Sequence, residues 1–243
     1  MRQRLLRYAH LALRLVFPPK CPSCGERMPF DTAAVLCPYC RSRYENAKGM
    51  TCPCCASRMA DCLCLPAQME KHGIKRMAKL FPYEPQKEEV TARLIYALKH
   101  KNLRSLQNFL GKELAEPLRP LLLEGEVVVT YPPRGKHGIH HDGFDHAREL
   151  SLCVAHTLSL AHVDTLVRTR HAKQKSLSRT ARRREAAAAY ALREDVNLKG
   201  KRVILCDDVC TTGATLISAA RLLKKAGAKE VVCAALALTP EKY

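Results

Sequence analysis

Two short apolar runs near the C-terminus flank a segment with helical periodicity. Residues 202–206 and 231–236 are rich in β-branched and small apolar residues, which is typical of buried strands. Between them apolar residues recur at the spacing of one helix face, and Gly227 is a natural helix stop. A strand, a helix and a second strand in this order form a βαβ unit. The pattern therefore predicts a mostly parallel sheet.

The upstream pattern extends this unit into a full α/β domain. Further strands are predicted at residues 78–83, 127–131 and 163–167, and helices at residues 88–100, 103–123 and 145–160. Arg104, Lys112 and Glu113 are expected on exposed helix faces. The segment from Arg134 to His141 is expected to be a loop. Residues 1–17 predict a basic amphipathic helix that docks on the core or a partner, or is simply solvated.

The strand at residues 202–206 runs into two adjacent carboxylates and a hydroxyl-rich loop, Asp-Asp-Val-Cys-Thr-Thr-Gly-Ala-Thr from Asp207 onward. Ligands of open parallel sheets bind at the carboxyl ends of strands. Carboxylates accept hydrogen bonds from vicinal sugar hydroxyls, and hydroxyls with backbone N–H groups at a helix start hold phosphate. The string predicts a site for a phosphorylated sugar. The alternative is a capped helix preceded by two solvated acids.

The string resembles the 5-phosphoribosyl-1-pyrophosphate (PRPP) signature of type I phosphoribosyltransferases. The resemblance implies that Asp207 and Asp208 bind the ribose 2′ and 3′ hydroxyls. It assigns the 5-phosphate to Thr211, Thr212, Gly213, Ala214 and Thr215. It also implies Mg²⁺ bound together with PRPP. Because this fold also serves regulators, the signature indicates the ligand more strongly than turnover.

Nine of the 13 cysteines lie between Cys21 and Cys64. Their spacing predicts one zinc ribbon and a second, tighter one, with Cys54 as a spare thiol or alternative ligand. The expected ligands are Cys21, Cys24, Cys37 and Cys40 at the first site and Cys52, Cys55, Cys62 and Cys64 at the second. Disulfides are the alternative. The odd number of cysteines and the lack of an evident signal peptide favour metal-bound thiolates in a reducing cytoplasm.

The other four cysteines, Cys153, Cys206, Cys210 and Cys233, stand in apolar surroundings and are expected in or near the core. Cys210 lies inside the hydroxyl-rich string, so it is expected to be partly exposed.

A Cys-rich N-terminus ahead of a PRPP motif resembles the ComF family of competence-associated phosphoribosyltransferase-like proteins. Segments 17–19, 94–99 and 143–147 also resemble family segments, as do Gln174, Leu177 and Arg182 by their spacing. The resemblance implies a type I phosphoribosyltransferase-like parallel-sheet α/β core behind a small zinc ribbon module. The expected parts are an N-terminal helix (1–20), a double ribbon (21–70) and the core (71–243). It further implies a role in DNA uptake, with single-stranded DNA and an uptake helicase as partners.

Three positions depart from the family, one of them Glu185, which stands where the family has asparagine. Asp142 stands where the family has arginine, and Gly138 stands at another usually basic position. Type I enzymes hold pyrophosphate near this segment, so the lost positive charge weakens the case for pyrophosphate chemistry. Lys136 and the histidines at positions 137, 140 and 141 are candidates to compensate.

The net charge is +18, and no acid lies between Asp164 and Glu185 while arginines and lysines accumulate there. A polyanionic partner is the natural inference, either PRPP or nucleic acid, and a solvated face is the alternative. This run also resembles the mobile loop that closes over PRPP. The residues expected to neutralise pyrophosphate are Arg134, Lys136, Lys173, Lys175 and Arg182.

No apolar run reaches the roughly 18–20 residues of a membrane span. The motifs and the net charge are compatible with two functions. One is a PRPP-binding factor that handles single-stranded DNA in the cytoplasm. The other is an active transferase that moves the phosphoribosyl group of Mg-PRPP to an unknown nitrogen acceptor, for which no general base is evident.

Overall fold

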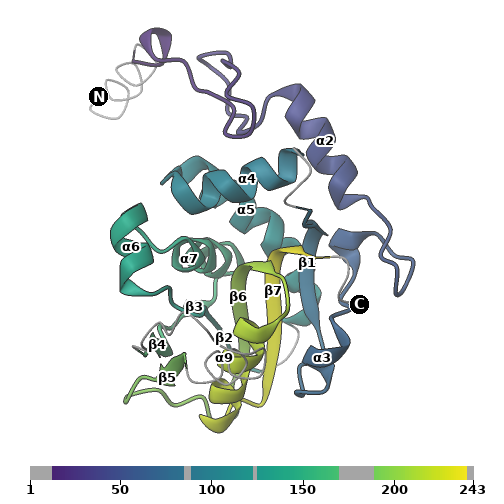
Figure 1. Ribbon diagram of the computed structural model, residues 1–243, viewed down its shortest axis with the longest axis vertical. Coiled ribbons are helices and arrows are strands. Elements are labelled where there is room, and N and C mark those ends of the chain that lie inside the picture. The colour runs from purple at the N-terminus through teal and green to yellow at the C-terminus, as the bar shows by residue number, and fades with distance from the viewer. Residues whose placement is uncertain (1–12, 85–88, 123–124, 170–188, 240–243) are drawn as a thin grey trace, which may run out of the picture.

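The computed structural model describes residues 13–84, 89–122, 125–169 and 189–239. At its centre is a five-stranded parallel sheet with the strand order β1-β7-β6-β2-β3 (Figure 1). Its strands are β1 (Met77–Pro82), β2 (Val127–Thr130), β3 (Ala161–His162), β6 (Arg202–Cys210) and β7 (Glu230–Leu238). A small antiparallel pair joins β4 (Leu166–Arg168) to β5 (Tyr190–Leu192).

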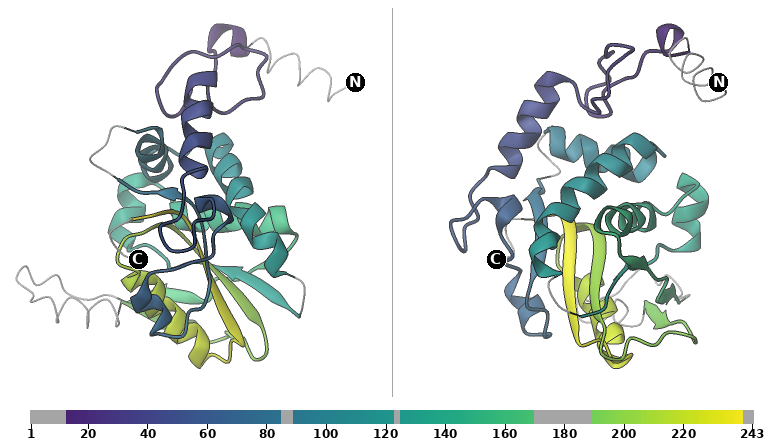
Figure 2. Two further views of the ribbon diagram at one scale, coloured as in Figure 1. Left: turned by 90° about the vertical axis from the view of Figure 1, so that its right-hand side faces the viewer. Right: turned by 180° about the vertical axis from the view of Figure 1, so that it is seen from behind.

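Helices bury the central strands on both faces. Neighbouring residues of β6 point to opposite sides, so Ile204 and Cys206 join one apolar layer while Val203 and Leu205 join the other. The first layer includes residues of α4 (Val90–His100), α5 (Arg104–Ala115) and α7 (His146–Leu158). The second includes residues of α3 (Ala67–Glu70) and α9 (Ala214–Lys225) (Figure 2). Burial on both faces explains why β6 is a continuous apolar run.

The predicted βαβ unit at the C-terminus is confirmed. β6 and β7 pair in parallel, with Leu205 opposite Cys233, and α9 connects them. Gly227 follows the end of α9 with a φ of 93°, a left-handed conformation that stops the helix.

Two predicted elements are wrong. Of the strand expected at residues 163–167, only residues 166–167 form a strand, because the chain leaves the main sheet after β3 and pairs again only at β4. Thr165 lies between β3 and β4, and its buried hydroxyl forms a 2.7 Å hydrogen bond with the hydroxyl of Thr130 at the end of β2. The helix expected at residues 103–123 ends as α-helix at Ala115 and continues as the 3-10 helix η2 (Glu116–Leu121). Pro117 and Pro120 cannot donate the hydrogen bonds that an α-helix requires.

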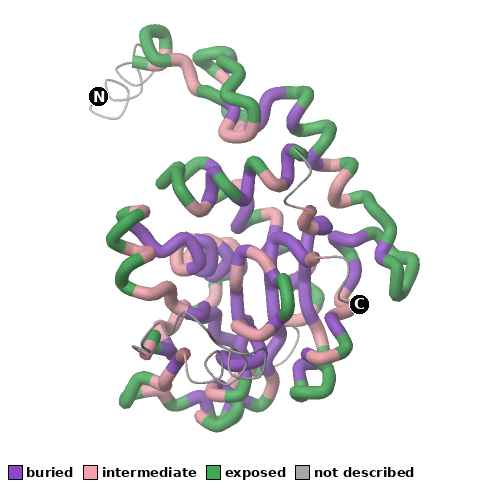
Figure 3. Tube along the Cα trace, viewed as in Figure 1, coloured by how far each residue is buried: buried purple, intermediate pink, exposed green. Residues whose placement is uncertain are grey.

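The Cys-rich module joins the core through α2 (Pro38–Lys48). Tyr44 of this helix is completely buried, with its ring centroid 5.8 Å from that of Phe81 in β1 and 5.3 Å from that of Phe109 in α5. Glu113, expected on an exposed face, is largely covered and forms an ion pair with Lys48. The module is therefore packed on the core through α2, although its first loops are mostly exposed (Figure 3).

The N-terminal helix expected at residues 1–17 lies largely outside the described residues. No helix within the described ranges is long and apolar enough to cross a membrane.

Candidate functional site

The hydroxyl-rich loop connects β6 to α9 at the carboxyl end of the parallel sheet. β6 extends to Cys210, so the paired acids occupy the end of the strand itself. Thr211 and Thr212 are exposed, and Gly213 precedes the first turn of α9 with a φ of 73°. The first N–H groups of a helix have no backbone acceptors within it, so two hydroxyls and several such N–H groups lie at one helix end. The N–H of Ala214 contacts the Thr212 hydroxyl at 3.4 Å. This arrangement suits an anion such as phosphate.

Gly213 also makes room for the Cys-rich module. A Cβ at this position would lie 2.8 Å from Cγ of Met69, which is fully buried in α3. The Met69 sulfur lies 3.8 Å from Sγ of Cys210. Cys210 is consequently buried, and the expectation that it is partly exposed is wrong. Met69, which follows the second cysteine cluster in the chain, therefore packs directly against this loop.

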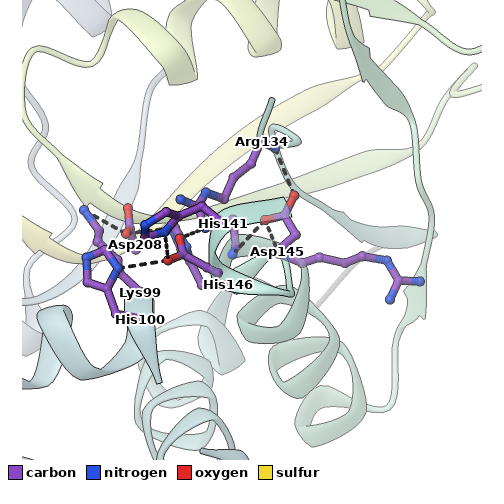
Figure 4. A network of polar contacts seen from close by, with 10 residues as sticks. Lys99, His100, Arg134, His141, Asp145, His146 and Asp208 are labelled. Atoms are coloured by element: carbon purple, nitrogen blue, oxygen red, sulfur yellow. Dashed lines mark hydrogen bonds and ion pairs between the residues drawn. The ribbon is translucent and has the colours of Figure 1, made fainter. Parts of the chain in front are cut away.

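The two adjacent carboxylates face different surroundings. Asp208 shares its strand face with Cys206 and points toward α4 and α7. Its Oδ2 lies 3.1 Å from Nζ of Lys99 and 2.9 Å from Nε2 of His146 (Figure 4). Asp207 lies on the opposite face of the strand, and its Oδ1 accepts a hydrogen bond from the backbone N–H of Asp208 at 2.9 Å. Within the described chain Asp207 forms no ion pair.

Their pKa values shift in opposite directions. Burial acts to raise the pKa of Asp208, but the hydrogen bond from His146 and the charge of Lys99 outweigh it and hold that pKa well below its usual range. Burial and the neighbouring Asp208 charge raise the pKa of Asp207 well above its usual range. Asp208 is thus ion-paired within the protein, whereas Asp207 is not.

The segment expected to be a loop at residues 134–141 instead contains α6 (Lys136–Asp142). The Asp142 carboxylate at its end lies 2.9 Å from Nδ1 of His141, 3.1 Å from Nδ1 of His100 and 2.8 Å from Nη1 of Arg134. These three contacts hold the pKa of Asp142 well below its usual range. Gly138 leaves the space for this arrangement, because a Cβ there would lie 3.1 Å from Nη2 of Arg134. Arg134 is therefore already ion-paired with Asp142, and its expected role toward pyrophosphate stays a prediction.

Asp145 ties this segment to the paired acids. Its carboxylate accepts hydrogen bonds from the N–H groups of Arg134 at 2.9 Å and of Ala147 at 3.1 Å, and so caps α7. The next residue, His146, reaches Asp208 (Figure 4). The segment from 143 to 147 thereby links the loop after β2 to the end of β6.

Two other cations lie near this edge. Lys136 is exposed at the start of α6. Arg168 ends β4, where its side chain lies beside Gly135 and donates a hydrogen bond to the Tyr190 hydroxyl at 3.2 Å. Lys173, Lys175 and Arg182 lie outside the described residues.

The sequence did not identify Lys99 or His146 as site residues, and it placed Arg168 only within the basic run expected to close over PRPP. The sequence did carry a signal for Lys99 and His146, because both lie inside segments that resemble a known family.

Eight cysteines form the two clusters that their spacing predicts. Within each cluster the four Sγ atoms lie within 4.8 Å of one another, and the members are Cys21, Cys24, Cys37 and Cys40, and Cys52, Cys55, Cys62 and Cys64. Four thiolates at this spacing are compatible with tetrahedral structural zinc. All 13 cysteines are free. The Sγ atoms of Cys55 and Cys62 lie 3.4 Å apart and those of Cys24 and Cys37 lie 3.7 Å apart, far longer than a disulfide bond of about 2.05 Å. Cys54 is exposed and belongs to neither cluster.

The two knuckles repeat one turn. The N–H of Cys21 donates to the Glu26 carbonyl and the N–H of Cys52 to the Ser57 carbonyl, both at 2.8 Å. The first turn places Gly25 at a φ of 78°, whereas the second places Ala56 at 58°. Alanine pays roughly 1–2 kcal/mol for a left-handed conformation, so the second knuckle forms against this strain.

Two known domain families match separate parts of the chain. Residues 151–243 match the phosphoribosyl transferase domain, and residues 12–70 match the double zinc ribbon domain. Competence protein ComFC of Streptococcus pneumoniae is 24% identical over 226 residues, which cover 87% of this chain and 96% of that protein.

Ribose-phosphate pyrophosphokinases match shorter stretches. The enzyme of Thermococcus kodakarensis is 49% identical over 41 residues, or 17% of this chain and 15% of that protein. The Pyrococcus furiosus enzyme is 28% identical over 149 residues, or 58% and 44%. The chain therefore spans less than half the length of these pyrophosphokinases.

Solved structures with partial likeness include glutamine PRPP amidotransferase from B. subtilis, at 20% identity and a TM-score of 0.40, covering 58% of this chain and 30% of that one. A hypoxanthine-guanine phosphoribosyltransferase from Bacillus anthracis matches at 17% identity and a TM-score of 0.38, covering 59% and 73%. Likenesses this partial support no conclusion about the site.

Proposed function

We propose that this ComF-like chain, with a phosphoribosyltransferase-type core behind a double zinc ribbon, binds PRPP or a related ribose 5-phosphate at the carboxyl end of β6. One observation carries the proposal. Asp207, free of ion pairs within the described chain, adjoins the loop 211–215 at the start of α9. A carboxylate for ribose hydroxyls next to an anion-binding helix end suits a sugar phosphate.

The residues around Asp207 have supporting roles. Asp208 is held by Lys99 and His146 through Oδ2 and by the Val209 N–H through Oδ1, so in this proposal it fixes the strand end beside the ribose site. Lys136 and Arg168, with Lys173, Lys175 and Arg182, neutralise the pyrophosphate. Mg²⁺ bound together with PRPP would supply further positive charge for this task.

The pairing of Arg134 with Asp142 favours binding over turnover. A transferase stabilises the departing pyrophosphate with cations, and here one candidate cation is neutralised by a neighbouring carboxylate. An active transferase with a nitrogen acceptor is the alternative, and release of pyrophosphate from PRPP would support it.

A second part of the proposal concerns nucleic acid. Tyr39 in α2 is 66% exposed, the Arg43 guanidinium lies 5.9 Å from its ring centroid, and Phe17 and Phe30 are also exposed. An exposed ring beside an arginine, with two further exposed rings, on a chain of net charge +18 suits single-stranded DNA. Similarity to a competence protein supports a role in competence. The proposed action in DNA uptake in the cytoplasm, with a helicase partner, rests on the family resemblance of the sequence.

The test compares Asp207→Asn with Asp195→Asn, an exposed acid outside the site. Calorimetric titration with Mg-PRPP is expected to show at least a tenfold loss of affinity in Asp207→Asn only. Affinity for a single-stranded oligonucleotide should be equal in both variants and fall steeply with salt. Unchanged PRPP affinity in Asp207→Asn would refute the sugar-phosphate site, and DNA affinity that ignores salt would refute the electrostatic interface.

A further inference from the structure

A fully buried lysine lies beside the second cysteine cluster. Lys79 is in β1, within the central sheet, and has no exposed surface. Its Nζ lies 3.2 Å from Sγ of Cys62 and donates hydrogen bonds to the carbonyls of Cys64 at 2.7 Å and of Cys62 at 3.3 Å. An ammonium taken out of water costs several kcal/mol unless negative charge and acceptors surround it. A lysine kept at this position therefore points to a source of negative charge at the cluster.

A metal site made of four thiolates provides that charge. Zn²⁺ with four Cys⁻ ligands carries a net charge of about −2, and hydrogen bonds to its sulfurs orient the ligands and tune the metal. Cys62 is one of the four residues of the second cluster and is itself buried.

We propose that Lys79 is the buried counter-charge of the second metal site, donating a hydrogen bond to the Cys62 thiolate. The site is then composite, because its four ligands come from the Cys-rich module and its compensating charge comes from the core sheet. Metal at this site and the position of β1 stabilise each other.

The first cluster is built differently. Its four sulfurs belong to residues 21–40, away from β1 in the sequence. Each cluster has one exposed cysteine, Cys24 in the first and Cys55 in the second, so exposure does not distinguish them. The backbone N–H groups of nearby residues contact these sulfurs, and across the described ranges no lysine or arginine hydrogen-bonds to them. The first cluster therefore serves as an internal control when metal binding at the second cluster is measured in the same molecule.

The experiment uses the full chain loaded with two zinc ions and challenged with a chromogenic chelator. Lys79→Met keeps the length of the side chain but removes its charge and donors, and Lys75→Met, at an exposed lysine, is the matched control. We expect a 10- to 100-fold loss of zinc affinity at one site in Lys79→Met and none in Lys75→Met. Repeating the challenge in a Cys21→Ser/Cys24→Ser background identifies the weakened site as the second.

Cobalt substitution gives a readout that depends on the thiolates. The thiolate-to-cobalt absorption of the second site is expected to shift in Lys79→Met, because the Cys62 sulfur loses a charged donor. Lys79→Gln, which keeps a donor without the charge, is expected to fall between Met and wild type, and it carries the test if the Met variant does not fold. Zinc affinity at the wild-type level in Lys79→Gln, or equal weakening of both sites, would overturn the proposal.

Discussion

Asp207 and Asp208 are neighbours in β6, yet the pKa of the first is raised and that of the second is lowered. Burial and the adjacent charge disfavour the ionised form of Asp207. The folded state is therefore penalised as pH rises from the unfolded pKa, near 3.9, through the folded one. Asp208 behaves in the opposite way, because His146 and Lys99 stabilise its carboxylate. Its contribution to stability is complete above the unfolded pKa and is lost as pH falls toward the folded one.

Substitutions at the two positions should consequently change stability in opposite directions. At pH 7 we expect Asp207→Asn to raise the free energy of unfolding, and Asp208→Asn to lower it by about 1–2 kcal/mol because it leaves Lys99 and His146 without their carboxylate. The gain in Asp207→Asn should shrink as the pH is lowered toward 4, while the loss in Asp208→Asn persists. Urea denaturation at both pH values measures these differences, and shifts of the same sign would contradict the assignment.

At the scale of elements, the short helix α3 connects the second cysteine cluster to the loop before α9. Met69 is fully buried between Cys210 and Gly213, so α3 supports the loop proposed to hold phosphate. A left-handed glycine in contact with this methionine leaves little room for alternative loop conformations.

Met69→Ala is expected to lower the free energy of unfolding by about 2–5 kcal/mol, because it opens a cavity beneath the loop. Met69→Leu, which conserves volume, should cost less than about 1.5 kcal/mol. Hydrogen exchange should accelerate at residues 211–215 in the alanine variant and PRPP binding should weaken. Destabilisation that leaves exchange in this loop unchanged would show that α3 does not support it.

At the scale of the whole molecule, the Cys-rich module and the core share contacts at several points. Tyr44 packs on Phe81 and Phe109, Lys48 pairs with Glu113, and Lys79 reaches into the second cluster. These contacts make the double ribbon part of one packed structure (Figures 1 and 3).

Removing the metal should therefore affect the whole chain. A strong chelator is expected to lower the midpoint of thermal unfolding of the core as well as the module, because metal ligation stabilises only the folded state. Calorimetry and the far-ultraviolet circular dichroism of the zinc-loaded and chelated protein measure this change. If the core unfolds at the same midpoint with and without the chelator, the module and the core are energetically independent.

Local patterns were sufficient to predict the βαβ unit, the parallel sheet and the two cysteine clusters. A run such as 202–206 carries its own signal, because burial on both faces demands apolar residues at every position. Cysteine spacing likewise reflects the short turn that brings two thiolates to one metal. The split strand after β3, the helix α6 and the covered Glu113 were missed, because contacts with distant segments decided them.

The sequence by itself determined the fold class, the metal ligands' grouping and the position of the acids at a strand end. Only the tertiary structure decided which of the two acids is left without an ion pair, since Lys99 and His146 reach Asp208 from two other helices. Packing likewise brings Arg134 into an ion pair with Asp142, in space that Gly138 leaves free. It also places the Lys79 ammonium beside the Cys62 sulfur. The physical reason is common to all three: ionisation depends on burial and on charges within a few ångströms, and residues far apart in the chain supply those charges.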